Sequence, residues 1–159
     1  MLTAVELEEL EQCIRSDVSV GSANICDDDG WCLLHSAAYY GNHRLLEHLF
    51  RQEPRPDLEM MLPGTRMTPL LLAATTGHYD AFMLLLEYGA DVNATDHMNR
   101  TALHLTQSGR IAEALLRYGI NYHVHDKSPV SHHGETALET AIREGKLAVQ
   151  SAILKFIQP

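Results

Sequence analysis

The segment from Thr68 to Asp96, TPLLLAATTGHYDAFMLLLEYGADVNATD, is the clearest copy of a unit that recurs along the chain. Its Thr68 can cap a helix with its hydroxyl group, and Pro69 suits the first helical position because no N–H donor is needed there. Gly77 predicts the end of this short helix, since glycine adopts the left-handed conformation at little cost. Residues 79–88 predict a second, leucine-rich helix, which ends at Gly89. The segment therefore predicts a helix, a turn, a second helix and a hairpin-like loop.

Four copies of this unit align on the residue that precedes the first helix. These residues are Cys32, Thr68, Thr101 and Thr136, which lie 36, 33 and 35 residues apart. The third copy is the irregular one, because Thr101 to Gly119 spans 18 residues where Thr68 to Gly89 spans 21. We therefore expect a shortened first helix around residues 107–109 and a long loop over residues 120–133.

The first residues of the chain predict a helix of their own. Residues 4–17 combine Val5, Leu7, Leu10 and Ile14 on one side with several glutamates elsewhere. Such a helix suits the end of a repeat array, where one face packs and the rest meets water. We therefore divide the chain into a capping helix or degenerate repeat (1–26), repeat 1 (27–62), repeat 2 (63–95), repeat 3 (96–130) and repeat 4 or C-terminal cap (131–159).

A period near 33 residues with T-P-L-H-x-A-A, then G-H, then L-L-L-x-x-G-A-D-V-N-A, resembles the ankyrin repeat. Residues 68–96 match closely, with Leu71 where the family usually has histidine. Other departures are Arg66 and Asn99 at a usual glycine, Cys32 at the usual threonine and Glu139 at a usual histidine. The resemblance implies an all-α ankyrin-repeat solenoid of stacked helix-turn-helix units with hairpin-like loops. It also implies a concave binding surface formed by the loop tips and the first helices.

The resemblance assigns partner binding to residues just before the T-P-L-H motif and just before the glycine that ends each first helix. These residues are Asp28, Asp29, Trp31, Tyr39, Tyr40, Thr65, Met67, Thr75, Thr76, His97, Met98, Arg100, His133, Glu135, Arg143 and Glu144. The aromatic residues Trp31, Tyr39 and Tyr40 fall within one repeat, and such side chains are enriched at interface hot spots. The alternative is that they pack against the acidic N-terminal helix or a neighbouring loop.

Histidines invite a metal or catalytic interpretation. His35 and His104 occupy the T-P-L-H position, where the family uses histidine to hydrogen-bond between repeats. A further group lies on the third loop: His123, His125, Asp126, His132 and His133. These side chains could offer nitrogen and oxygen ligands to zinc, but they lack helical spacing and accompanying cysteines. We expect no metal site and no cofactor, and no catalytic motif points to an enzyme.

Charge and cysteine content exclude several classes of function. A net charge of -9 and a pI near 5.5 argue against nucleic-acid binding, which needs clustered lysine and arginine. The apolar runs are too short to span a membrane. The three cysteines, Cys13, Cys26 and Cys32, are odd in number and lack a CxxC spacing. We therefore expect reduced thiols and a cytoplasmic or nuclear location.

Two narrower resemblances concern single segments. Leu85 lies eight residues before Asn93, which is similar to the site at which ankyrin proteins are hydroxylated on asparagine by a cytosolic oxygenase. The shortened helix at residues 107–109 is similar to the short repeat of the small cyclin-dependent kinase inhibitors. In those proteins the short repeat is the second, whereas here two complete repeats precede it.

Together these features predict a non-enzymatic protein–protein interaction module, an adaptor or scaffold that is monomeric by itself. We expect it to bind another protein or peptide through its concave surface, with a basic patch of the partner facing Asp28, Asp29 and Glu135. Two alternatives are an inhibitor that docks on an enzyme such as a protein kinase, and a metal-binding protein.

Overall fold

The computed structural model describes residues 26–129 and 132–158. The described part of the chain forms eight helices and isolated β-bridges but no β-strand. The helices are α2 (Leu33–Tyr39), α3 (His43–Phe50), α4 (Pro69–Thr76), α5 (Tyr79–Glu87), α6 (Ala102–Leu105), α7 (Gly109–Arg117), α8 (Ala137–Arg143) and α9 (Leu147–Ile157). None of the described helices is long and apolar enough to cross a membrane. The helix predicted over residues 4–17 lies outside the described residues.

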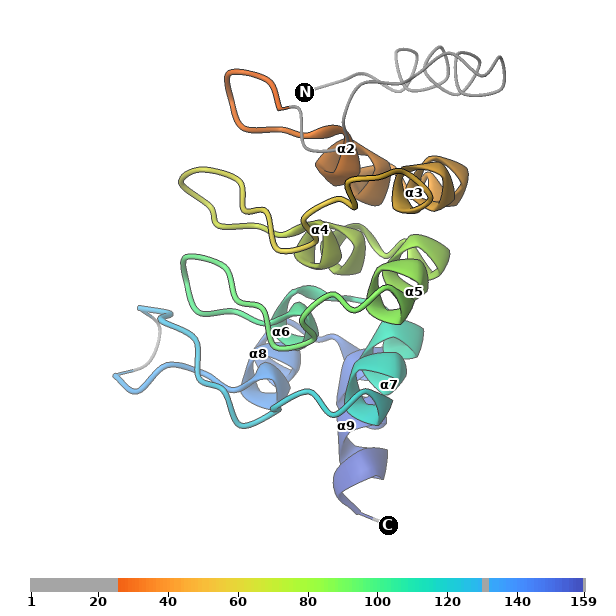
Figure 1. Cartoon of the computed structure of the whole chain (residues 1–159). Helices are drawn as coiled ribbons and strands as arrows, with labels where there is room; N and C mark the ends of the chain where they lie inside the picture. Colours follow the sequence, from red (N-terminus) through yellow and green to blue (C-terminus); the bar gives the residue numbers. More distant parts are fainter. Residues whose placement is uncertain (1–25, 130–131, 159) are drawn as a thin grey trace.

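The eight helices form four stacked pairs. Figure 1 shows the first helices α2, α4, α6 and α8 in one column and the second helices α3, α5, α7 and α9 in another. A hairpin precedes each first helix, and the hairpins project on the same side. The predicted all-α solenoid is therefore confirmed. We call the surface formed by these hairpins and the first helices the hairpin face.

The helix boundaries follow the local signals in the sequence. The Thr68 hydroxyl accepts a hydrogen bond from the Leu71 N–H at 3.4 Å, and Pro69 takes the first position of α4. Gly77 ends α4 with a φ of 81°. In the preceding pair, the Asn42 side chain accepts from the Leu45 N–H at the start of α3. A cap and a glycine thus mark the limits of α4, and a cap marks the start of α3.

One apolar core runs through all four pairs. Alanines such as Ala37, Ala73 and Ala112 are fully buried and let neighbouring helices approach closely. Large side chains such as Phe82 and Leu115 fill the space between the layers. Because each pair completes the core of the next, the repeats stabilise one another.

The histidines of the T-P-L-H positions bond to backbone carbonyl groups further along the chain. His35 Nε2 lies 2.9 Å from the Met60 carbonyl oxygen, and His104 Nε2 lies 3.1 Å from the Glu135 carbonyl oxygen. His104 therefore holds the hairpin of the following repeat, as expected from the resemblance, whereas His35 holds the loop that leads from α3 to the second hairpin. Burial is the main cause that lowers the pKa of both histidines.

The third repeat has the shortened first helix that the spacing predicts. Helix α6 has four residues, whereas α4 has eight. Thr106 then leaves the helix in an extended conformation, with φ of -66° and ψ of 148°. The Ser108 hydroxyl accepts from the Ile111 N–H and starts α7 without a connecting turn of normal length.

Two departures from the family pattern leave the hairpins intact. Arg66 and Asn99 stand at usual glycine positions and adopt positive φ angles of 56° and 59°. Gly30 and Gly134, at the corresponding positions of the first and fourth copies, have φ angles of 79° and 75°. The hairpin turn therefore imposes its left-handed residue even where the side chain disfavours it.

The expectation that all cysteines are reduced is wrong for Cys26 and Cys32, which form a disulfide. The two residues face each other in the antiparallel bridge at the base of the first hairpin. The same bridge joins Thr95 to Thr101 and His125 to Thr136 in later repeats. The hairpin geometry, and not a CxxC spacing, thus brings the two sulfur atoms together. Cys13 lies outside the described residues.

Candidate protein-binding surface

Hydrogen bonds between successive hairpins make the hairpin face one continuous surface. The His97 N–H donates to the Thr65 carbonyl oxygen at 3.0 Å, and the Lys127 N–H donates to the Met98 carbonyl oxygen at 2.7 Å. The Asn99 side chain adds a bond of 2.7 Å to the His125 carbonyl oxygen. Residues of three successive hairpins, those before α4, α6 and α8, are therefore held in fixed relation to one another.

Within the hairpins, aspartates close the turns. The Asp96 carboxylate is fully buried and accepts from the backbone N–H groups of Met98 and Arg100. Asp126 accepts in the same way from the N–H groups of Ser128 and Glu135. Such carboxylates stabilise the hairpins and are not free to meet a partner.

The first hairpin carries the acidic run of the sequence. Asp27 closes this turn by accepting from the N–H groups of Asp29 and Trp31. The bond from the Trp31 N–H is the main cause that lowers the pKa of Asp27. Asp28 and Asp29 are exposed at the tip, as their assignment to partner binding requires.

A cavity of about 290 Å³ opens where α6 stops short. Its lining residues are Thr75, Met98, Arg100, His104, Leu105, Gln107, Asp126, Ser128, Thr140, Arg143, Glu144 and Lys146. Thr75 lies in the last turn of α4 and Arg143 ends α8, so the cavity lies between the ends of two full-length first helices. The residues missing from α6 therefore leave an open space on the hairpin face, about the size of one large side chain.

Cations line this cavity, and the most buried carboxylates lie behind them. Arg100 contacts Asp96 at 2.7 Å, and Arg143 contacts Glu135 at 2.8 Å. The two arginine side chains are each 39% exposed, whereas those of Asp96 and Glu135 are 0% and 11% exposed. Lys146 donates to the His104 carbonyl oxygen and contacts Glu144 at 2.9 Å. A partner entering the cavity would therefore meet hydrogen-bond donors held in place by buried acids.

The aromatic residues of the first repeat form a row. The rings of Trp31 and Tyr39 meet edge to face at 5.9 Å, and those of Tyr39 and Tyr40 at 5.1 Å. All three side chains are half-buried, and Tyr40 also packs on the core. The rings therefore contact one another and still reach the surface. Partner binding by them stays a prediction, and the N-terminal helix of the alternative lies outside the described residues.

The residues assigned to partner binding from the sequence fall into three groups. Exposed residues are Asp28, Asp29, Thr65, Thr75, His97, His133, Arg143 and Glu144. Half-buried residues are Trp31, Tyr39, Tyr40, Met67, Thr76, Met98 and Arg100. Glu135 is buried, and its carboxylate contacts Arg143 and the Thr140 hydroxyl. Glu135 therefore does not face a basic partner as expected, because it anchors Arg143 instead.

Several cavity residues have no place in the sequence assignment. Leu105, Gln107, Ser128, Thr140 and Lys146 line the cavity from three different segments. The sequence feature that could have indicated this cavity is the shortened third copy, since a missing helical turn must leave space between the neighbouring first helices. Which side chains border that space depends on how repeats 2 and 4 approach it.

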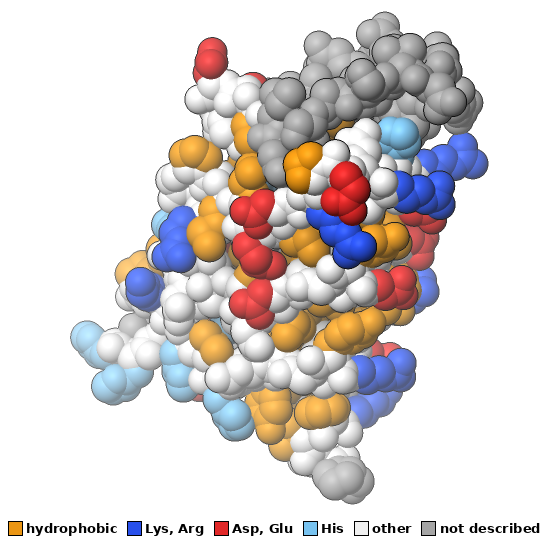
Figure 2. All heavy atoms as spheres, in the orientation of Figure 1, with side chains coloured by type: hydrophobic (Ala, Val, Ile, Leu, Met, Phe, Trp, Pro, Cys, Tyr) orange, Lys and Arg blue, Asp and Glu red, His pale blue; other side chains and the backbone are white. Residues whose placement is uncertain are grey.

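The histidines of the third loop lie at the surface and are not arranged as a metal site. Figure 2 shows histidine side chains gathered at the lower left, where the hairpin before α8 projects in Figure 1. Within residues 26–129 and 132–158, no group of three or more His, Cys, Asp or Glu side chains is arranged to hold a metal ion. The Asp126 carboxylate already accepts two backbone hydrogen bonds within its hairpin turn.

Comparison with known proteins identifies the family. The family model described as ankyrin repeats (3 copies) matches residues 2–96. The chain is similar to the ankyrin and armadillo repeat-containing protein of Mus musculus, with 32% identity over 59% of the chain and 6% of that protein. It is similar to ankyrin repeat and SOCS box protein 3 of Homo sapiens, with 34% identity over 52% of the chain and 16% of that protein.

A third relative is SMC5-SMC6 complex localization factor protein 1 of Homo sapiens, with 36% identity over 43% of the chain and 6% of that protein. The chain therefore spans between 6% and 16% of the length of these relatives. The family model covers more than half of the chain and agrees with the four stacked helix pairs. The chain belongs to the ankyrin repeat family.

Proposed function

We propose that this chain is a non-enzymatic adaptor or scaffold module that binds one protein partner across its hairpin face. Ankyrin repeats are protein–protein interaction modules. One observation carries the proposal further: Thr75, Met98, Arg100, Arg143 and Glu144 were assigned to binding from sequence position alone, and all five line one cavity. Residues from three repeats thus surround a space that a partner side chain can fill.

The hairpin face is suited to binding because it is already ordered. Hydrogen bonds join its hairpins, and buried aspartates close its turns. A surface that needs little ordering on association loses less conformational entropy, which favours affinity. The aromatic row at Trp31 offers apolar area for a hot spot, and the cavity beside α6 offers directional hydrogen bonds.

The rival function is inhibition of an enzyme such as a protein kinase by docking. A four-residue α6 supports the likeness to the short repeat of the small kinase inhibitors, but its position as the third repeat does not. The similarity to a protein named as a complex localization factor supports the adaptor role. Purified chain added to a kinase assay separates the two roles, since only an inhibitor lowers the rate.

The proposed surface is tested with a partner captured by the wild-type chain, identified by mass spectrometry and then purified. Trp31→Ala removes the aromatic anchor, and Thr75→Trp fills the cavity from its rim. Each should weaken the partner's affinity by roughly 30-fold, the loss of about 2 kcal/mol that defines a hot spot. Tyr118→Ala and Ser151→Trp are matched controls, because Tyr118 directly follows α7 and Ser151 lies exposed on α9, away from the hairpin face.

Equal losses in the control variants would show that the partner binds elsewhere or that the variants are misfolded. Unchanged binding by both Trp31→Ala and Thr75→Trp would contradict the proposed surface. Thermal unfolding of every variant separates a binding loss from a folding loss.

We also propose that the chain is a substrate for asparagine hydroxylation at Asn93, in the cytoplasm or nucleus. Asn93 is exposed, and its side-chain oxygen accepts from the Asn121 N–H at 2.8 Å. Leu85 is fully buried in α5, so an oxygenase that reads both residues needs local opening of this repeat. Mass spectrometry of the chain from cells should find one added oxygen atom on Asn93, and an unmodified Asn93 in cells that contain the oxygenase would contradict the proposal.

A further inference from the structure

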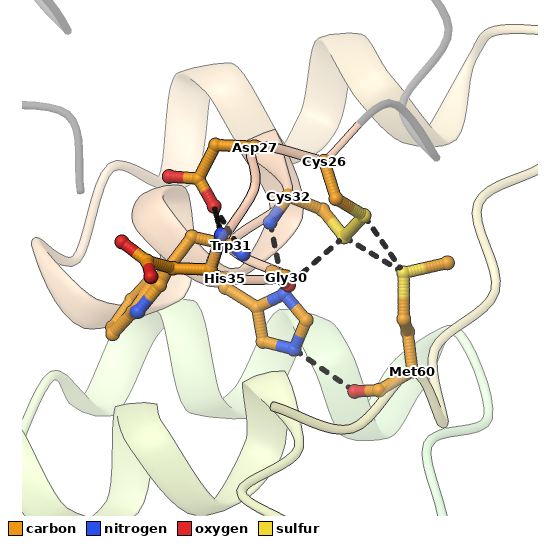
Figure 3. The surroundings of a disulfide bond; sticks show 8 residues. Cys26, Asp27, Gly30, Trp31, Cys32, His35 and Met60 are labelled. Carbon is orange, nitrogen blue, oxygen red and sulfur yellow. Dashed lines mark hydrogen bonds between the residues drawn. A yellow bond between two sulfur atoms is a disulfide. The ribbon is translucent and has the colours of Figure 1, made fainter. Parts of the chain in front are cut away.

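Three sulfur atoms meet beneath the first hairpin. Cys26 and Cys32 form the disulfide, and Met60 Sδ lies 3.3 Å from Cys26 Sγ and 2.7 Å from Cys32 Sγ. Figure 3 shows the methionine side chain directed at the two cysteines from the loop that follows α3. Two segments far apart in the sequence therefore bring all three sulfur-bearing side chains to one point.

The surrounding backbone holds this arrangement. His35 Nδ1 accepts from the Cys32 N–H at 3.3 Å, and its Nε2 lies 2.9 Å from the Met60 carbonyl oxygen. One imidazole thus connects the backbone of Cys32 to the loop of Met60, and both of its nitrogens are hydrogen-bonded. His35 is therefore a positioning residue and not a further ligand. Cys32 is buried, whereas Cys26 and Met60 are half-buried, so the sulfur cluster lies close to the surface.

The chemistry of the three groups selects one kind of ion. Thiolate and thioether sulfurs are soft ligands that favour Cu(I). Structural zinc instead takes four ligands drawn from thiolate, imidazole and carboxylate, and thioether is not among them. We propose that, once the Cys26–Cys32 disulfide is reduced, the two thiolates and the Met60 thioether bind one Cu(I) ion. This site lies apart from the third-loop histidines.

A phosphine gives two electrons to the disulfide and is oxidised to the phosphine oxide, taking its oxygen atom from water. The sulfur–sulfur bond breaks, and each cysteine gains one of the two protons of that water molecule. Cu(I) then forms three copper–sulfur bonds while the two thiols release two protons. The copper does not change its oxidation state. The oxidised chain has no thiolate at this point and does not bind the ion.

The experiment uses the full chain with Cys13→Ser, so that the third cysteine supplies no sulfur ligand to the copper. The chain is reduced with a phosphine without oxygen and titrated with Cu(I) against a coloured Cu(I) chelator of known affinity. X-ray absorption spectra count the sulfur neighbours of the bound copper. We expect one copper per chain, three sulfur neighbours and no tight binding by the oxidised chain.

Methionine variants decide the role of the thioether. Met60→Leu keeps an apolar side chain of similar size, and it should weaken Cu(I) binding at least tenfold and leave two sulfur neighbours. Met67→Leu is the matched control, because Met67 is also half-buried and lies only seven residues after Met60, but outside the sulfur cluster. It should bind as the wild type does.

Equal binding by Met60→Leu and the wild type would overturn the proposal, and so would equal binding by the oxidised chain. Met60 would then only pack against a structural disulfide. Circular dichroism of the reduced chains checks that the repeats stay folded. If the reduced wild-type chain unfolds, the proposal also fails, because the site needs the hairpin and Met60 together.

Discussion

The hydrogen bonds of His104 provide a direct test of how successive repeats are held together. The buried ring accepts from the Thr101 N–H at 3.2 Å through Nδ1 and bonds to the Glu135 carbonyl oxygen at 3.1 Å through Nε2. We consider His104→Leu. The second repeat already has Leu71, fully buried, at the corresponding position, so leucine fits this slot. The variant therefore measures the loss of hydrogen bonds and not a steric clash.

The expected loss follows from the groups left without partners. His104→Leu removes the Nδ1 atom that bonds the Thr101 N–H and the Thr101 hydroxyl, and the Nε2 atom that bonds the Glu135 carbonyl oxygen. Each unsatisfied group costs about 1–3 kcal/mol, and burying leucine offsets part of this, so we expect a loss of about 2–4 kcal/mol. For a chain of this size each kcal/mol lowers the melting temperature by about 2–4 °C, so the shift should be on the order of 5–15 °C.

The assay is thermal and urea unfolding of His104→Leu beside His133→Leu. His133 is exposed in the neighbouring hairpin, so its substitution should change the free energy of unfolding by less than about 0.5 kcal/mol. If His104→Leu is no less stable than His133→Leu, the contact between repeats does not depend on this histidine, and our account of the stacking is refuted.

Three further predictions concern stability. The native state keeps the two T-P-L-H histidines neutral because burial lowers each pKa, so the free energy of unfolding should fall as pH drops below about 6.5, where the unfolded chain takes up protons first. Melting temperatures measured between about pH 8 and 5.5 test this. The melting temperature of His104→Leu should fall less steeply with pH than that of the wild type. Arg66→Gly removes a side chain held at a φ of 56° and should raise stability by about 0.5–1 kcal/mol in urea unfolding; a loss would contradict this. Gly134→Ala should be much more destabilising than Gly145→Ala in the same assay, because both glycines have positive φ but only Gly134 has the Asp126 carbonyl oxygen in the way of an added Cβ; equal losses would contradict the steric reason.

Features with a local cause were predictable from the sequence. Thr68, Pro69 and Gly77 mark the limits of α4 because a cap, a missing donor and a left-handed residue act within a few positions. The short α6 followed from spacing alone, since the third copy lacks three residues. The bonds made by His35 and His104 were expected from the family resemblance.

The disulfide was missed because a spacing rule was applied where hairpin geometry mattered. Cys26 and Cys32 are six residues apart, a separation with no known motif, yet they occupy facing positions at the base of a hairpin. The corresponding pair Thr95 and Thr101 shows that this bridge recurs in the fold. Aligning the hairpin positions across repeats would have revealed the facing cysteines.

The sequence by itself determined the repeat, the helix pairs and the irregular third unit, because caps, glycines and apolar periodicity act over short distances. Only the tertiary structure decided how exposed the assigned residues are and which of them meet. In the folded chain Glu135 is buried behind Arg143, and Thr75 and Lys146 line one cavity beside the short α6. It also placed Met60 against a disulfide 28 residues earlier in the chain. Contacts between segments from different repeats depend on the stacking of whole units, which no local pattern specifies.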